Sequence, residues 1–357
     1  MFYFLDPVDI YIQLYRSVFI ILVIGSLLLI PLAACGKPAA KTFTLRLAHF
    51  FPATHPAETV LVKQWADALD KATDGQVKIE SYPGESLLKA PDIYNGVVEG
   101  VTDIGLSCFA YTPGRFPVLE SFELPGIVYL NSRSASMVAW EGIQSLNPKE
   151  VQDTHLLMVL ATGPGDLFTK TPVRSLTDLQ AMEIRATGLS AETIKLLGGI
   201  PVGMPQSDTY DALSKGVVKG NLAPVEVLKG WKNAEVTEYI TKTPFLYNTL
   251  FFVTINKDIW ASMPADLQKK ITDTTTTFHA ETAAGLWDMQ NAEAMKFALD
   301  EQKMEVIELP EEEAQRWISQ VMPIQDAYKQ KLAGLGLNVD PLKMINELAE
   351  KYNKLYE

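Results

Sequence analysis

The sequence has few of the residues that most enzymes use for chemistry. Its 357 residues include two cysteines and four histidines. The histidines form neither an HExxH motif nor a zinc-ligand spacing. No P-loop, GxGxxG fingerprint or GxSxG nucleophile elbow occurs either. These absences favour a binding protein over an enzyme, and they predict neither a cofactor nor a metal site.

Basic residues are also in the minority. The chain has 31 Lys and Arg against 43 Asp and Glu, which gives a formal net charge of −12. An acidic chain argues against a nucleic-acid partner and against a polybasic membrane-binding face. Any site for an anion must therefore depend on a local cation. The hydrophobic content of 47% and charged content of 21% are typical of a folded globular protein.

The longest uncharged apolar run lies near the start of the chain. It covers Ser17–Leu32, follows Arg16, and is followed by the small residues Ala33 and Ala34. A basic residue, an apolar core and small residues in this order are typical of a secretory signal. The run is shorter than the roughly 20 residues that span a bilayer. We therefore predict a signal peptide at residues 1–34, with an uncleaved single-span anchor as the alternative.

The segment Leu32-Ala33-Ala34-Cys35 resembles the lipobox of bacterial lipoproteins. This resemblance implies that the Cys35 thiol carries diacylglycerol, so that membrane lipid is a partner through acylated Cys35. Residues 35–42 then form the lipidated cysteine and a short spacer. An ordinary signal peptide with a chance cysteine is the alternative. If Cys35 is lipidated, Cys108 has no disulfide partner, and its apolar neighbours predict a small buried side chain.

The part after residue 34 is longer than one hydrophobic core usually serves, which predicts two domains. Hydrophobic periodicity predicts strands at 43–49, 77–82, 104–108, 155–161, 183–186 and 250–256. It predicts helices at 56–72, 85–99, 190–197, 264–302, 311–332 and 341–355, and another that begins near Ser207. Alternating strands and helices predict an α/β fold with mainly parallel strands. The segment 264–302, which only Gly285 interrupts, is long enough to brace two domains.

Several segments carry a family resemblance through their order and spacing. They are Leu45–His49 with Glu58 and Trp65, Tyr82-Pro83-Gly84 with Gly96–Leu106 (GVVEGVTDIGL), Pro172–Leu179 (PVRSLTDL), Met182–Arg185 (MEIR), Leu197–Val202 (LGGIPV), Tyr210–Gly220 (YDALSKGVVKG) and Asn256–Pro264 (NKDIWASMP). Together they resemble the extracytoplasmic solute-binding proteins of TRAP transporters, also called the DctP family. The resemblance extends over nearly the whole chain after the signal peptide.

This resemblance implies a two-lobed, periplasmic-binding-protein-like α/β fold of type II, with a hinge and a long bracing helix. Lobe I would comprise 43–162 and about 249–288, and lobe II 163–248 and about 289–357. The family is not enzymatic and needs no cofactor. Its cargo is usually a small organic carboxylate, and its partner is an ion-coupled membrane permease. The implied location is periplasmic or extracytoplasmic. Service to an ABC importer or a sensor, a C4-dicarboxylate cargo and an exported enzyme are the alternatives.

Arg185 is the principal candidate for binding the ligand. It ends a short strand, and ligands gather at the carboxyl ends of strands in open α/β sheets. The planar guanidinium matches a carboxylate through two parallel hydrogen bonds. By resemblance, Arg185 occupies the carboxylate-binding position of the family. A surface arginine in a salt bridge is the alternative reading.

Further candidates come from the strand ends, from neighbouring segments and from the resemblance. Core packing is the alternative for the aromatic candidates, and a simple turn is the alternative for the glycine. These ligand-binding candidates are Phe50, Phe51, Tyr111, Gly165, Gln206, Ala223, Trp231 and Asn248. The chain departs from the family pattern at two of them: Ala223 stands where an amide often contacts the ligand, and the segment that begins at Gly165 lacks a second arginine. One cation with aromatic neighbours predicts a monocarboxylate with an apolar or aromatic body.

Overall fold

The computed structural model describes residues 8, 41–335, 337 and 340–357. The chain forms two compact units, Met1–Lys41 and Thr42–Glu357, and the fold below is that of the second unit. Apart from Val8, the predicted signal peptide lies outside the described residues, as does Cys35. Within the described ranges, no helix is both long and apolar enough to cross a membrane.

The first of two sheets has five strands and is mixed. Its order is β2 (Val77–Tyr82), β1 (Phe43–His49), β3 (Ile104–Cys108), β10 (Leu250–Asn256) and β4 (Thr154–Ala161). The first three are parallel, whereas β10 runs antiparallel to both β3 and β4. The strands predicted at 43–49, 77–82, 104–108 and 250–256 are confirmed at both ends.

The second sheet has six short strands. Its order is β11 (Glu305–Ile307), β9 (Tyr239–Thr241), β5 (Gly165–Thr169), β8 (Gly220–Pro224), β6 (Glu183–Arg185) and β7 (Ile200–Val202). β6 is parallel to β7 and β8, while β5 is antiparallel to β8 and β9. Both sheets are thus mixed, and each has a run of three parallel strands at one side, β2-β1-β3 in the first sheet and β8-β6-β7 in the second.

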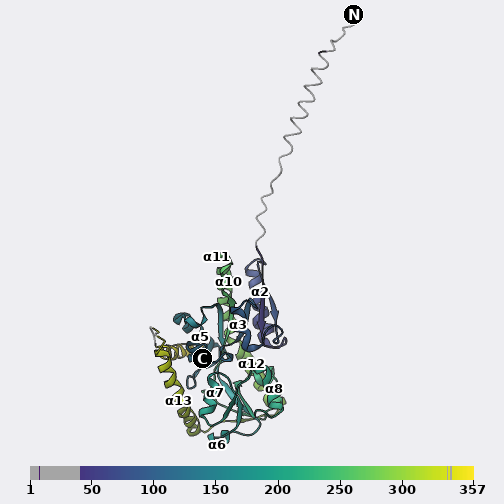
Figure 1. Cartoon of the computed structure of the whole chain (residues 1–357). Coiled ribbons are helices and arrows are strands. Elements are labelled where there is room, and N and C mark those ends of the chain that lie inside the picture. The colour runs from purple at the N-terminus through teal and green to yellow at the C-terminus, as the bar shows by residue number, and fades with distance from the viewer. Residues whose placement is uncertain (1–7, 9–40, 336, 338–339) are drawn as a thin grey trace. The chain divides into compact units, whose positions relative to one another are not determined.

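Helices surround both sheets (Figure 1). The helices are α2 (Lys63–Ala72), α3 (Ile93–Val98), α4 (Pro117–Glu120), α5 (Ser132–Leu146), α6 (Leu176–Leu179), α7 (Leu189–Leu196), α8 (Gln206–Ser214), α9 (Val227–Gly230), α10 (Lys257–Ala261), α11 (Ala265–Glu281), α12 (Leu286–Lys296), α13 (Glu311–Ala333) and α14 (Pro341–Leu355). α5 and α11 pack against β4, α3 packs against β3, and α7 packs against β7. Their apolar faces and the sheets bury one large core that includes Trp65, Trp287 and Trp317.

The predicted continuous helix at 264–302 is wrong, because α11 and α12 are separated by a tight turn at Ala283–Gly285. Side chains of α5 take over the carbonyls that a continuous helix would use. Ser132 and Ser136 each donate a hydrogen bond to the Ala284 carbonyl, at 3.2 and 3.1 Å. Arg133 donates to the carbonyl of Ala280. Hydrogen bonds from α5 side chains therefore replace backbone hydrogen bonds of the helix at this point, and α11 ends there.

α13 is the longest uninterrupted helix of the described residues and contacts both parts of the fold. Gln320 donates to the carbonyl of Leu196 at the end of α7, and Gln325 donates to the carbonyl of Pro125. Figure 1 shows α13 running alongside α7. We predicted that the segment 264–302 braces the two parts of the fold. α13, which is nearer the end of the chain, contacts both parts as well.

The predicted helix at 85–99 is shorter than expected. It begins only at Ile93, after a 3-10 turn at Ala90–Asp92. Pro91 disfavours helical geometry in the residue before it. Glu85 has a positive φ of 61°, and its carboxylate accepts a hydrogen bond from the Ala90 backbone at 2.8 Å. The helix predicted at 56–72 likewise opens with a π-helical turn, Ala57–Val62, before α2.

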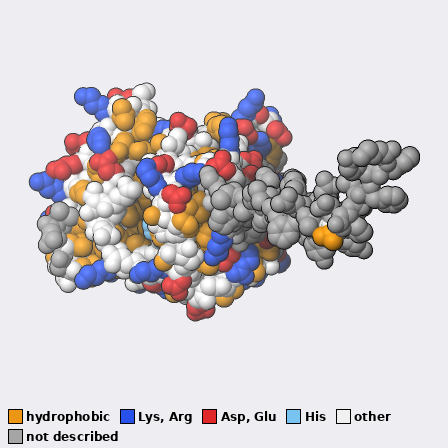
Figure 2. Space-filling view, turned by 90° about the horizontal axis from the view of Figure 1, so that it is seen from above, with side chains coloured by type: hydrophobic (Ala, Val, Ile, Leu, Met, Phe, Trp, Pro, Cys, Tyr) orange, Lys and Arg blue, Asp and Glu red, His pale blue; other side chains and the backbone are white. Residues whose placement is uncertain are grey.

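The chain passes between the sheets more than once. It leaves β4 through Thr162–Pro164 into β5, returns into β10 after Asn248, and contributes β11 to the six-stranded sheet. α14 then packs against α5, beside the five-stranded sheet. The predicted boundaries of the two lobes stay a prediction. On the face drawn in Figure 2, basic and acidic side chains are interspersed rather than gathered into a basic field.

Candidate ligand-binding site

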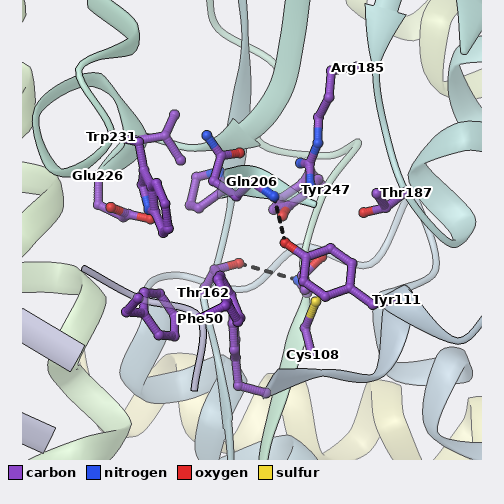
Figure 3. Close-up of a pocket in the computed structure, with 15 residues that line it drawn as sticks. Phe50, Cys108, Tyr111, Thr162, Arg185, Thr187, Gln206, Glu226, Trp231 and Tyr247 are labelled. Carbon is purple, nitrogen blue, oxygen red and sulfur yellow. Dashed lines mark hydrogen bonds between the residues drawn. The ribbon is translucent and has the colours of Figure 1, made fainter. Parts of the chain in front are cut away.

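A cavity lies where the ends of strands from both sheets meet, and the space between its lining atoms, including the part open to solvent, is about 340 Å³. From the five-stranded sheet and its connections come Phe50, Phe51, Cys108, Tyr111, Thr162, Tyr247, Thr249 and Phe251. From the six-stranded sheet and its connections come Arg185, Thr187, Gln206, Pro224, Glu226, Val227 and Trp231. Figure 3 shows these side chains converging on one space. Carboxyl ends of parallel strands are the usual place for a ligand in such folds.

Arg185 is a buried cation in the wall of this cavity. It ends β6 and is 3% exposed. Its Nε donates to the backbone oxygen of Met204 at 3.0 Å. Among the described residues, no Asp or Glu oxygen lies within 4.0 Å of its guanidinium. A buried charge is costly unless it is paired, and among the described residues the charge of this arginine has no carboxylate partner.

Arg185 is also the only Lys or Arg among the described residues that line the cavity. Lys242, which directly follows β9 of the six-stranded sheet, forms an ion pair with the buried carboxylate of Asp166 instead. Burial raises the pKa of that carboxyl, and Lys242 opposes the rise. The cavity therefore offers one cationic anchor rather than two.

Two tyrosines lie close to Arg185. Burial raises the pKa of both Tyr111 and Tyr247, and the Arg185 cation opposes the rise. Both phenols therefore keep their protons at neutral pH. The Tyr111 hydroxyl accepts a hydrogen bond from the Gln206 backbone at 2.9 Å, which joins the segment after β3 to the start of α8. That acceptance leaves the Tyr111 proton free to be donated elsewhere.

Aromatic rings form the opposite wall. Phe50 and Phe51 follow β1 and are 2% and 1% exposed. Their ring centroids lie 4.2 Å apart in a stacked arrangement, and the Trp231 ring lies 6.0 Å from Phe50 and 5.9 Å from Phe51. The Phe251 ring is tilted against the Phe51 ring, with the centroids 5.6 Å apart. A rigid aromatic wall of this kind binds a flat apolar body well.

Of the ligand-binding candidates, the structure brings six to the cavity and leaves three outside its lining. Phe50, Phe51, Tyr111, Arg185, Gln206 and Trp231 line it. The other three are Gly165, Ala223 and Asn248, and each has a structural contact that explains its place. Asn248 accepts from the Gly163 backbone at 3.1 Å and donates to the Phe122 carbonyl at 3.0 Å.

Gly165 and Ala223 lie just behind the wall. A Cβ at Gly165 would come within 2.6 Å of the Tyr247 ring and within 2.5 Å of the Ala223 carbonyl. Glycine at this position therefore lets Tyr247 reach the cavity. The Ala223 side chain packs in an apolar cluster with Val227 and Leu228. A direct role of either residue in ligand binding stays a prediction.

The sequence reasoning missed several lining residues, notably Cys108, Tyr247 and Glu226. Cys108 was recognised as a buried small side chain, and its 3% exposure confirms this. Glu226 hydrogen-bonds to His55, which is 171 positions away, so no local pattern could have paired them. Within the described residues, no cluster of three or more His, Cys, Asp or Glu side chains is placed to hold a metal ion.

Comparison with known proteins identifies the family. The sequence profile of "Bacterial extracellular solute-binding protein, family 7" (DctP) matches residues 47–331. The chain belongs to this family. A relative in it is the C4-dicarboxylate-binding periplasmic protein DctP of Rhodobacter capsulatus. That protein is 25% identical over 309 residues, which cover 84% of this chain and 90% of the relative.

Solved structures of TRAP solute-binding proteins share the two-lobed fold. One, from Rhodoferax ferrireducens T118 in complex with copurified benzoate, has a TM-score of 0.81 and 29% identity, with 88% of this chain and 100% of that chain covered. Another, from a marine metagenome and specific for aromatic acid ligands, is in complex with metahydroxyphenylacetate. It has a TM-score of 0.80 and 29% identity, with 87% of this chain and 99% of that chain covered. These relatives are solute-binding proteins, not enzymes.

This family member is therefore an extracytoplasmic solute-binding protein of the TRAP type. TRAP binding proteins bind small organic acids and work with membrane permease subunits. The fold and the family bear out the prediction from the sequence motifs at this level. The identity of the cargo is a finer question, which the cavity addresses.

Proposed function

We propose that this protein captures a small monocarboxylate with an apolar, aromatic body and delivers it to a TRAP permease. The observation that carries the proposal is the buried Arg185, which has no carboxylate partner among the described residues and faces stacked aromatic rings. The carboxylate would bind at Arg185, and the ring would lie against Phe50 and Trp231. The aromatic acids bound by two structural neighbours support this reading.

The hydrogen bond from Arg185 Nε to Met204 orients the guanidinium. Since Nε is occupied, the edge formed by the two Nη atoms is left for the carboxylate. Two parallel hydrogen bonds from that edge favour a planar anion over a spherical one. Closure of the two parts of the fold around the ligand would exclude water and strengthen this ion pair.

A single cationic anchor argues against a dicarboxylate. A second carboxylate would be buried without a cation, which costs free energy. Calorimetric titration of the protein, freed of copurified ligand by unfolding and refolding, tests this with phenylacetate, benzoate and succinate. We expect an aryl monoacid to bind and succinate to bind far more weakly. Equal affinity for succinate and the aryl acids would contradict the proposed cargo.

We further propose that the protein is exported by residues 1–34 and anchored by lipid on Cys35. The lipobox-like segment before Cys35 supports this. More than one acyl chain makes such anchoring stable. Expression of the full chain and of Cys35→Ser in a bacterial host tests it. We expect the full chain in the membrane fraction with an acylated Cys35 by mass spectrometry, and the variant released; equal membrane retention without acylation would refute the anchor.

A further inference from the structure

The end of the cavity away from Arg185 contains a second set of polar groups. Glu226 lies between β8 and α9, and Trp231 directly follows α9. Figure 3 shows these two side chains on the side of the pocket opposite Arg185. The proposed carboxylate site accounts for neither of them.

Glu226 is paired with His55 in a fixed tautomer. The distance from His55 Nε2 to Glu226 Oε2 is 3.2 Å, and the two side chains are 0% and 4% exposed. The Ala57 backbone donates to His55 Nδ1 at 3.0 Å. Because Nδ1 accepts this bond, the ring proton is on Nε2 and is donated to Glu226. Among the described residues, no Lys or Arg reaches ion-pair distance of the Glu226 carboxylate.

The backbone is shaped to accommodate this pair. A Cβ at Gly230 would come within 2.7 Å of Glu226 Oε2 and 3.0 Å of His55 Nε2. The backbone N–H of Glu226 donates to Asn291 of α12 at 2.9 Å, which holds the residue in place. The carboxylate therefore has a defined position, with one oxygen engaged by His55.

Two polar atoms at this end have no hydrogen-bond partner within the described chain. The Nε1–H of Trp231 is buried and donates to no described residue. The second carboxylate oxygen of Glu226 likewise accepts no hydrogen bond from a described residue, since its bonded oxygen is Oε2. A buried N–H such as that of Trp231 is nearly always hydrogen-bonded in folded proteins. One free acceptor and one free donor thus lie at the same end of the cavity.

We infer that this end of the cavity is a subsite for a ligand hydroxyl, remote from the carboxylate that binds Arg185. A hydroxyl both donates and accepts, so it can donate to Glu226 and accept from Trp231. An ammonium only donates, a carbonyl only accepts, and an apolar edge does neither. The favoured ligand is therefore a hydroxylated aromatic acid. This inference rests on the proposed function and narrows its substrate class.

Calorimetry on matched ligand pairs tests the subsite. The pairs are benzoate and phenylacetate with their 3- and 4-hydroxy forms, and 4-(aminomethyl)benzoate serves as a donor-only cation. A hydrogen bond to a charged partner corresponds to roughly tenfold to a hundredfold in affinity. We expect at least one hydroxylated acid to bind at least about tenfold more tightly than its parent. Glu226→Gln should abolish most of this preference, so that a hydroxylated acid and its parent bind this variant with similar affinity.

Glu293→Gln is the matched control, because this exposed carboxylate of α12 pairs with Lys229 on the adjacent surface. It should keep the hydroxyl preference. Trp231→Phe should lower that preference, because it removes the Nε1–H donor together with one ring of the indole, and circular dichroism verifies that each variant is folded.

Three outcomes would overturn the inference. Equal binding of hydroxylated and parent acids, or an equal loss for both in Glu226→Gln, would make the Glu226–His55 pair a purely structural link. Tighter binding of the aminomethyl acid than of every hydroxylated acid would make the subsite one for a cation. If no carboxylate binds at all, the proposed function itself fails, and the subsite with it.

Discussion

Replacing Arg185 by alanine should nearly abolish ligand binding without unfolding the protein. The side chain is 3% exposed and has one hydrogen bond, from Nε to the Met204 carbonyl. Its charge has no carboxylate partner among the described residues. The unliganded protein thus carries the desolvation cost of this cation, and the ligand supplies the compensating charge.

The magnitude follows from this burial. Removing one partner of a buried ion pair costs about 3–5 kcal/mol, which corresponds to roughly two to more than three decades in Kd. The same substitution should not lower the stability of the unliganded protein, because it removes an unpaired buried charge. Arg185→Met is the sharper variant here, since it also fills most of the volume.

Calorimetry gives Kd, and urea unfolding gives the free energy of unfolding of the unliganded variants. Arg174→Ala is the control, because Arg174 is exposed and pairs with Glu305 on the surface, where such pairs contribute little. Arg185→Lys should also fail, since it lacks the planar edge. Retention of wild-type affinity in Arg185→Ala, or in Arg185→Lys, would refute the assigned role.

Three further predictions concern the cavity wall and the core. Tyr111→Phe removes the acceptor for the Gln206 backbone N–H and should weaken binding about fivefold by calorimetry; unchanged affinity would show that this bond does not support the bound form. Burial raises the pKa of Glu123 to about 8, so the folded protein holds this proton to higher pH than the unfolded chain, and the stabilisation is lost as pH rises from about 4.5 to 8. As the pH rises from 5 to 8, the free energy of unfolding of Glu123→Gln, measured with urea, should therefore increase relative to that of the wild type by about 1 kcal/mol or more. Parallel pH profiles of the two proteins would contradict this cause. Gly163 has φ of 71° and a Cβ there would lie 2.7 Å from a backbone nitrogen, while Gly84 has φ of 64° in open space. Gly163→Ala should destabilise by roughly 1–3 kcal/mol more than Gly84→Ala, and equal urea midpoints would rule out the steric part of the argument.

Strands with a clear hydrophobic or alternating pattern could be predicted from the sequence, and those that depend on tertiary pairing could not. The runs at 104–108 and 250–256 are apolar and continuous, so their ends were predicted correctly. β8 reads Gly-Asn-Leu-Ala-Pro, a composition with low strand propensity. It is a strand because it pairs with β5 on one side and β6 on the other.

The helices show the same limit. α14 begins and ends as predicted, because Asp340 caps its first turn and an apolar face repeats along it. The break at Ala283–Gly285 has no comparable local signal apart from Gly285. It depends on hydroxyls of α5 that lie about 150 positions away in the chain, which no local pattern reveals.

In the site, strand-end reasoning placed Arg185, Phe50 and Phe51 at the cavity, because connections after parallel strands meet at one edge. It could not place Glu226, whose partner His55 lies in a different part of the fold. Arg185 could therefore be identified from the sequence as a residue of the cavity, whereas the polar groups at the opposite end could be found only from the packing.

Titrating the wild-type protein with an aryl carboxylate and with the corresponding carboxamide tests the central claim most directly. The two ligands have nearly the same shape, and only the acid carries a negative charge, which Arg185 does not find among the described residues. We expect the hydroxylated benzoate that binds best to lose about two decades or more in Kd as its amide. Equal binding of acid and amide would contradict the account, because the buried cation would then contribute nothing to recognition.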